Sequence, residues 1–220
     1  MTIESVSEIA AAAKKAALEL AHLSSDLKNK ALKEMALVLE NSYKSILEEN
    51  AKDLEFADKE NLVSPLIARL RLSENKILGM AKGIRSVANL DDPVGKRQMA
   101  MEMDEGLTLY RVTCPIGVIG AIFESRPDAV PQISSLCLKS GNAVILKGGR
   151  EAQHSNKIIV SLIRDAIRNI CGVPIGAVQM IETRSEVADM LKEDKNINLV
   201  VPRGSNEFVK YIQENTRIPV

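Results

Sequence analysis

Apolar residues recur every three or four positions between Ile9 and about Val87. Two series show the spacing: Leu27, Ala31, Met35 and Leu39, and then Ile77, Met80, Ile84 and Val87. Residues with this period share one face of a helix, so the pattern predicts a helical region whose apolar faces form core. We expect Ser25 and Ser73 to be N-caps. We expect Asp91-Asp92-Pro93 to end the region, because the residue before a proline is disfavoured in a helix.

The period changes at Gln98. Two short extended stretches, with Leu107 and Leu109 alternating against polar neighbours, surround Asp104-Glu105-Gly106. Alternation around a turn of this composition predicts a β-hairpin over Gln98–Val112.

From Gly117 onward, continuous apolar runs alternate with amphipathic segments. The predicted strands are Val118–Phe123, Ala143–Leu146, Ala177–Ile181 and Ile197–Val201, and the predicted helices lie near Asp128–Lys139, Ala152–Ile170, Ser185–Lys192 and Ser205–Asn215. Strands that are apolar on both faces, each followed by a helix, indicate a doubly wound α/β fold with a mostly parallel sheet. Ile218-Pro219-Val220 reads as the start of a further strand.

These patterns divide residues 1–220 into three parts. We expect a helical region over 1–97, a hairpin arm over 98–113 and an α/β sheet over 114–220, with helices covering both faces of the sheet.

The composition excludes several classes of protein. Hydrophobic residues make up 45% of the chain and charged residues 26%, while Lys+Arg and Asp+Glu both total 29. A balanced charge and 3% aromatic content argue against nucleic-acid binding and against an anionic membrane as partner. With no apolar run of about 18 residues and no leader-like N-terminus, we expect a cytoplasmic protein.

The cysteines and histidines predict neither a disulfide framework nor a metal site. Cys114, Cys137 and Cys171 have no C-x-x-C spacing, and His22 and His154 lie far apart. We interpret each cysteine as a small buried hydrophobe.

Candidate chemistry lies in the loops after the strands, since open α/β sheets bind ligands beyond the carboxyl ends of their strands. The first loop is Glu124-Ser125-Arg126-Pro127-Asp128, which is either a site or a turn capped by Asp128. The second loop follows the strand that ends at Lys147. We expect Gly141-Asn142, just before that strand, to form a left-handed turn. In this loop Gly148 and Gly149 permit close approach of a ligand, and Lys147 and Arg150 offer positive charge to a phosphate. The alternative is that Lys147 and Arg150 are solvated side chains on a flexible turn.

The third loop is Pro202-Arg203-Gly204-Ser205, followed by a helix. Free N–H groups at that helix start would favour an anion, although Ser205 is equally an N-cap. The chain contains neither G-x-G-x-x-G nor a Walker A sequence, so a standard dinucleotide fingerprint or a P-loop is not predicted.

Long segments of the chain resemble one family. PIGVIGAIFESRPDAVPQISSLCLKSGNAVILKGGREAQHSN, GAVQMIET and VVPRGSNEFVKYIQENTRIPV, together with ENAKDLEFA and RLRLSENKILGMAKGI, closely resemble the gamma-glutamyl phosphate reductase family of the aldehyde dehydrogenase superfamily. The resemblance implies reduction of L-glutamyl 5-phosphate by NADPH to L-glutamate 5-semialdehyde, with release of phosphate, in proline biosynthesis. In that family a cysteine thiolate captures the acyl group before the hydride is delivered.

The resemblance also implies roles for particular residues. Lys147 matches the lysine that holds the adenosine ribose and its 2'-phosphate, and Gly204 and Ser205 match the turn under the pyrophosphate. Glu124–Pro127 match the loop between cofactor and substrate, whereas Asp128 stands where many relatives have asparagine. The hairpin resembles an oligomerisation arm and implies a homo-oligomer.

The family's catalytic domain and its nucleophile lie beyond the position that Val220 matches. Neither Cys114 nor Cys137 matches that nucleophile, so we expect no catalytic residue in this chain and no activity from it alone. Two other interpretations stay open at this point: a nucleotide-binding module without catalysis, and a partner that binds glutamate 5-kinase.

Overall fold

The computed structural model describes residues 5–220, so the first four residues of the predicted helical region lie outside it. Within these residues, five helices come first: α1 (Val6–Leu20), α2 (Ser25–Asn41), α3 (Tyr43–Lys59), α4 (Ser64–Leu70) and α5 (Glu74–Ala88). Their starts follow local chemistry. Ser5 and Glu8 form a capping box on α1, and Ser73 caps α5 by accepting the N–H of Lys76, as predicted.

The predicted cap at Ser25 is wrong by one residue. Ser24 accepts the N–H of Leu27, and Ser25 is the first residue of α2. Two serines stand side by side in the sequence, and only the backbone conformation decides which one faces the free N–H groups.

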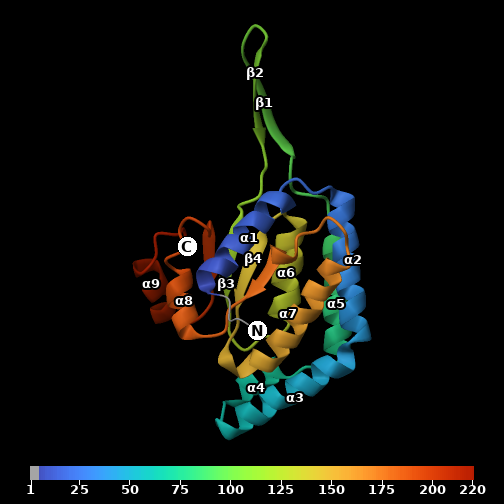
Figure 1. Ribbon diagram of the computed structural model, residues 1–220, viewed down its shortest axis with the longest axis vertical. Coiled ribbons are helices and arrows are strands. Elements are labelled where there is room, and N and C mark those ends of the chain that lie inside the picture. The colour runs from blue at the N-terminus through green and yellow to red at the C-terminus, as the bar shows by residue number, and fades with distance from the viewer. Residues whose placement is uncertain (1–4) are drawn as a thin grey trace.

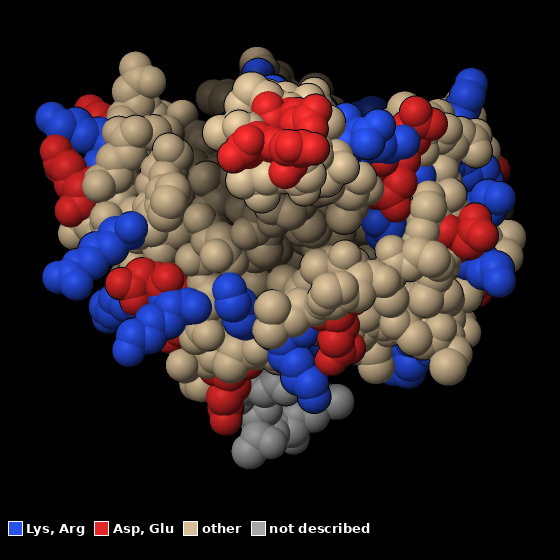
Figure 2. All heavy atoms as spheres, turned by 90° about the horizontal axis from the view of Figure 1, so that it is seen from above, with Lys and Arg blue, Asp and Glu red and all other residues tan. Residues whose placement is uncertain are grey.

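The hairpin consists of β1 (Arg97–Asp104) and β2 (Leu107–Val112), paired antiparallel. It confirms the prediction and extends away from the body of the molecule as an arm (Figure 1). Apart from the half-buried Met99, its apolar side chains, including Met103, Leu107 and Tyr110, are exposed. Seen from above, acidic side chains gather at the tip of the arm, while both charges are scattered over the rest of that face (Figure 2).

Four parallel strands form the sheet in the order β5-β4-β3-β6. They are β3 (Val118–Ile122), β4 (Ala143–Lys147), β5 (Val178–Met180) and β6 (Leu199–Pro202), each within two residues of the predicted bounds. The chain therefore moves outward from β3 through β4 to β5 and then returns to the other side of β3. Such a reversal is the switch point of a doubly wound sheet, where the loops after β3 and β6 diverge.

The helices of the sheet region are α6 (Ala129–Lys139), α7 (Gln153–Arg168), α8 (Arg184–Met190) and α9 (Asn206–Glu214), with short 3-10 turns η1 (Arg150–Ala152) and η2 (Ile175–Ala177). One face of the sheet is covered by α1 with α8 beside it, and the other by α6 and α7, against which α2, α3 and α5 pack (Figure 1). Helices α1, α2, α3 and α5 therefore share one core with the sheet and lie on both of its faces.

Two further predictions near the sheet can be compared with the structure: the turn at Gly141 and the strand at Ile218-Pro219-Val220. Gly141 has a φ of +72°, which confirms the left-handed turn that leads into β4. The expected strand at Ile218-Pro219-Val220 is wrong, since these residues form no strand and share with β6 a hydrogen bond from Val200 N–H to Pro219 O, at 2.8 Å. Pro219 has no N–H to donate, which prevents a continuous ladder there.

Among the described residues, no helix combines the length and the apolar character needed to cross a membrane.

Candidate functional site

The structure brings the three predicted loops together at the carboxyl edge of the sheet. The N–H of Phe123 donates to Lys147 O at 3.0 Å, and the N–H of Arg203 donates to Ile122 O at 2.8 Å. The ends of β3, β4 and β6 are thus joined directly, with β3 in the middle. Residues far apart in the sequence form one site because their parallel strands end at one edge.

Lys147 is half-buried at the end of β4. Burial lowers the pKa of its ammonium group, the Glu151 carboxylate opposes that shift, and the Arg184 guanidinium adds to it. An anion placed beside Lys147 would favour the charged form of this amine. Arg184, at the start of α8, is a second cation near this position that the sequence did not reveal.

The space beside the two loop glycines is filled by side chains of the protein. A Cβ on Gly148 would lie 2.1 Å from Asn156 Nδ2, and a Cβ on Gly149 would lie 1.9 Å from Glu151 Oε1. Because glycine has no Cβ, the side chains of Asn156 and Glu151 can occupy this space. Their packing explains the two glycines whether or not a ligand binds.

A small recess of about 10 Å³ opens beside Gly148, Arg150 and Asn156, roughly the volume of one water molecule. Asn156 lines this recess, and its buried Oδ1 accepts no hydrogen bond from any described residue. A hydroxyl donor that reached this oxygen would satisfy it. The Arg150 guanidinium lies 5.0 Å from the centre of the Phe56 ring, which holds it over α3.

The starts of α7 and α9 differ electrostatically. The first turn of α7 is occupied by Asp53 of α3, whose carboxylate accepts the N–H groups of His154 and Ser155. At α9, Ser205 is the N-cap, and among residues 5–220 its Oγ accepts only the N–H of Phe208, at 3.3 Å, which confirms that part of its interpretation. Ser205 is exposed, so the start of α9 is accessible to an anion and that of α7 is not.

In the first loop, Asp128 stands at the N-cap position of α6 but its side chain makes no capping hydrogen bond with a described residue, so the alternative interpretation as a turn capped by Asp128 is wrong. Its carboxylate instead binds the Arg126 guanidinium, with Nε to Oδ1 at 3.3 Å and Nη2 to Oδ2 at 2.7 Å. A two-point ion pair satisfies the carboxylate better than a backbone N–H would. Ser125 is bound by Glu151, and Pro127 is buried.

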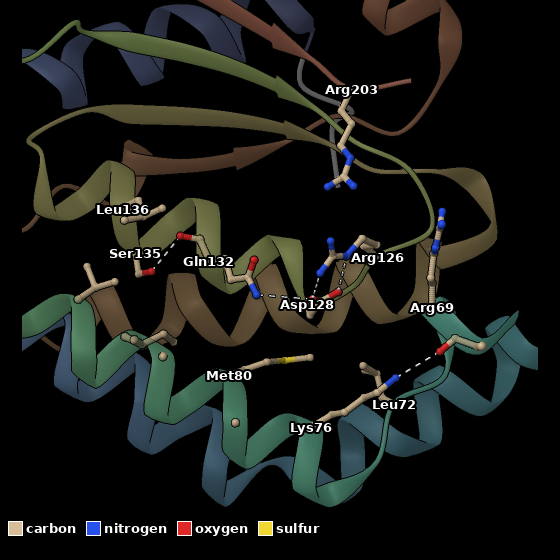
Figure 3. A pocket seen from close by; sticks show the side chains of 15 residues that line it. Arg69, Leu72, Lys76, Met80, Arg126, Asp128, Gln132, Ser135, Leu136 and Arg203 are labelled. Carbon is tan, nitrogen blue, oxygen red and sulfur yellow. Dashed lines mark hydrogen bonds and ion pairs between the residues drawn. The ribbon is translucent and has the colours of Figure 1, made fainter. Parts of the chain in front are cut away.

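A cleft of about 840 Å³ lies beside this loop, between α5 and α6 (Figure 3). Arg126, Asp128 and Gln132 line one wall, Lys76 and Met80 line the other, and Arg203 points into it. Arg69, which the sequence had not singled out, also lines the cleft. No local sequence signal marks Arg69, since only the packing of α4 brings it here.

The cysteines occupy three different environments. Cys137 is buried in α6, and burial raises the pKa of its thiol to about 12. Cys114 and Cys171 are exposed, so the prediction that all three are buried is wrong for these two. Cys114 precedes β3 and Cys171 follows α7, so both lie at the end of the sheet opposite the three loops.

Residues 1–218 match the aldehyde dehydrogenase family. The chain is 52% identical over 216 residues to the gamma-glutamyl phosphate reductase of Acetivibrio thermocellus and 54% identical over 212 residues to that of Methanosarcina barkeri. These alignments cover 98% and 94% of this chain but only 50% and 47% of the relatives. The chain thus spans about half the length of the curated relatives it matches, in their N-terminal half.

Solved structures agree with this similarity. The gamma-glutamyl phosphate reductases of Thermotoga maritima and Saccharomyces cerevisiae superimpose with TM-scores of 0.94 and 0.93, at 37% and 44% identity. Each covers 99% of this chain, and the chain covers 53% and 56% of them. An acetylating aldehyde dehydrogenase of Geobacillus thermoglucosidasius, at 17% identity and a TM-score of 0.74, shares the fold. The chain belongs to the aldehyde dehydrogenase family.

Proposed function

We propose that this chain supplies the cofactor-binding part of an NADPH-dependent enzyme of proline biosynthesis that reduces L-glutamyl 5-phosphate to L-glutamate 5-semialdehyde and releases phosphate. The observation that carries the proposal is the meeting of Lys147, the accessible start of α9 and the loop Glu124–Asp128 at one edge of the sheet. The names of the relatives, gamma-glutamyl phosphate reductases, support the reaction.

The site has the donors that a phosphorylated dinucleotide requires. Lys147 would hold the 2'-phosphate, the Gly204-Ser205 turn and the start of α9 would face the pyrophosphate, and Gly148 and Arg150 would border the ribose. The buried acceptor Asn156 Oδ1 would take a hydroxyl proton. Bound NADPH would supply the hydride for the reduction.

The cleft beside Glu124–Asp128 would hold the acyl phosphate substrate. Arg126 is paired with the Asp128 carboxylate, whereas the Lys76 ammonium keeps its charge while donating to the carbonyls of Arg71 and Ala68. Arg69 and Arg203 are free to bind an anion, since neither guanidinium has an ion-pair or hydrogen-bond partner in residues 5–220. Glutamyl 5-phosphate carries a carboxylate and a phosphate, which match two free cations.

None of the three cysteines is proposed as the nucleophile. Cys137 is a buried thiol with a raised pKa, and Cys114 and Cys171 lie away from the carboxyl edge of the sheet. We therefore expect no turnover of glutamate semialdehyde by these 220 residues alone.

The arm supports association between copies of the protein. Its paired strands leave both outer edges free and expose apolar side chains such as Met101, Met103 and Leu107. We expect a homo-oligomer in the cytoplasm, which sedimentation would detect as an average mass that rises with concentration. Glutamate 5-kinase is the protein partner that fits the substrate, because direct transfer would protect a labile acyl phosphate from water.

Titration of the folded chain with NADPH and NADH tests the cofactor site. Lys147→Ala should weaken NADPH binding by about ten- to a hundredfold, the effect of losing a contact of roughly 1.5–3 kcal/mol to a charged group, and change NADH binding much less. Arg150→Ala and the double variant show whether Arg150 shares the phosphate. Lys33→Ala, an exposed lysine on α2, is the control. Equal losses for both cofactors would contradict the role of Lys147.

A further inference from the structure

The side chain of Glu151 connects the loop after β4 to the loop after β3. Glu151 Oε1 accepts the backbone N–H of Ser125 at 2.7 Å and the hydroxyl of Ser125 at 2.5 Å. Both donors come from one residue and converge on one carboxylate oxygen. Hydrogen bonds to an ionised acceptor are shorter and stronger than those between neutral groups, so this contact is a strong local constraint.

The surroundings favour a persistent contact. Ser125 is 4% exposed, and the Glu151 side chain is half-buried. Limited access to water strengthens the hydrogen bonds and makes their loss costly. Gly149 leaves the space that the Glu151 carboxylate occupies, because a Cβ at that position would lie 1.9 Å from Oε1. The loop sequence is therefore compatible with this contact only while position 149 lacks a side chain.

Glu151 also acts on Lys147, because its negative charge favours the protonated form of that half-buried amine. On the other side, Ser125 directly precedes Arg126, which pairs with Asp128 and lines the cleft. One carboxylate thus touches the first loop and interacts with the cation of the second.

We propose that Glu151 is a positioning residue that holds the loop Glu124–Asp128 in register with the loop of Lys147, so that NADPH bound at Lys147 orders the loop beside the cleft. The inference rests on the proposed function and adds energetic coupling between the cofactor site at Lys147 and the loop Glu124–Asp128 beside the cleft. An anion bound at Lys147 would weaken the attraction between its ammonium and the Glu151 carboxylate, which already accepts both Ser125 donors. Because linkage is reciprocal, a ligand that orders Glu124–Asp128 should in turn tighten NADPH binding.

Hydrogen exchange of the 220-residue chain, read by mass spectrometry on peptides that cover 123–128, tests the proposal. NADPH should slow exchange of this segment in the parent chain. Glu151→Ala should speed its exchange about tenfold or more, the effect of losing a charge-assisted hydrogen bond, and abolish the NADPH response. Glu151→Gln keeps an acceptor oxygen and should restore most of the protection while weakening the response, because a neutral amide does not sense the charge at Lys147.

Two further variants separate positioning from general stability. Ser125→Ala removes the hydroxyl and keeps the backbone N–H, so it should give an intermediate loss of protection. Glu8→Ala removes the capping box of α1 and should lower thermal stability without changing exchange at 123–128.

The possible results distinguish this inference from the proposed function. NADPH that binds without slowing exchange at 123–128, or Glu151→Ala exchange equal to that of the parent chain, would overturn the coupling and leave the cofactor site intact. A folded chain that does not bind NADPH would overturn the proposed cofactor role and the coupling with it.

Discussion

The buried carboxylate of Asp53 on α3 accepts the backbone N–H groups of Ser155 at 2.7 Å and of His154 at 2.9 Å, at the start of α7. A side chain about 100 positions earlier therefore caps the helix that follows the Lys147 loop. The consequence is functional as well as structural. With its positive end neutralised, α7 has little attraction for a phosphate, and the second loop depends on its side-chain cations instead.

Replacing Asp53 tests this cap. Asp53→Ala leaves the buried N–H of Ser155 and the partly buried N–H of His154 without an acceptor and should lower the free energy of unfolding by about 1–3 kcal/mol, measured in urea. Asp53→Asn keeps one acceptor and should lose less. Asp58→Ala, an exposed residue of the same helix, should stay within about 0.5 kcal/mol of the parent chain. Equal effects at positions 53 and 58 would rule out the cap.

Two glycine-to-alanine substitutions separate the effect of helix propensity from the effect of a steric clash with a neighbouring side chain. Gly149→Ala places a methyl group on the Glu151 carboxylate and should destabilise the chain and displace Glu151 from Ser125. Gly83→Ala, in α5, meets nothing within 4 Å and should stabilise the chain by about 0.5–1 kcal/mol, because alanine favours the helix. Thermal unfolding shows whether each substitution raises or lowers the stability of the chain. A stabilising Gly149→Ala would contradict the proposed arrangement of Glu151 and Ser125.

The cysteines should differ in reactivity toward a thiol reagent. At pH 8, Cys114 and Cys171 should react quickly because they are exposed, and Cys137 should react only after unfolding. Fast labelling of three thiols in the folded chain would contradict the burial of Cys137.

Burial also raises the pKa of Cys137 from an ordinary value of 9.0 to about 12, which predicts a pH dependence of stability. Above pH 9 the unfolded chain releases this proton more readily than the folded chain. The stability contribution of the neutral thiol is therefore complete below pH 9 and is lost progressively between pH 9 and about pH 12. Cys137→Ala should reduce this decline, which urea unfolding at several pH values would detect.

The free cations of the cleft predict selectivity for a ligand with two anionic groups. Glutarate should bind more tightly than butyrate, and Arg69→Gln and Arg203→Gln should each reduce that preference by roughly two- to fivefold, as expected for exposed ion pairs. Arg111→Gln, on the exposed arm, is the control. The measurement is NMR titration at constant ionic strength, and equal binding of the two acids would contradict the assignment.

The sequence alone was sufficient for the fold class, the hairpin and the four strands of the sheet, but it also predicted a strand at Ile218-Pro219-Val220 that does not form. The apolar period of the helices, the alternation in the hairpin and the fully apolar runs of β3, β4 and β6 each depend on neighbours within a few positions. The same local signals placed Lys147 and Ser205 at the carboxyl edge of a parallel sheet. Local signals failed where two candidates stood side by side, as with Ser24 and Ser25, or where a better partner lay nearby, as with Asp128 and Arg126.

Only the tertiary structure decided which residues act together across the sequence. Asp53 lies within ENAKDLEFA, a segment that resembles the family, yet nothing in that segment reveals a helix partner about 100 residues away. The contact of Glu151 with Ser125 and the entry of Arg69 into the cleft likewise depend on packing between distant elements. Periodicity reports which face of an element is buried, because burial repeats with the turn of the helix or strand. It carries no information on which distant side chain meets that face, since this depends on how all the elements pack into one core.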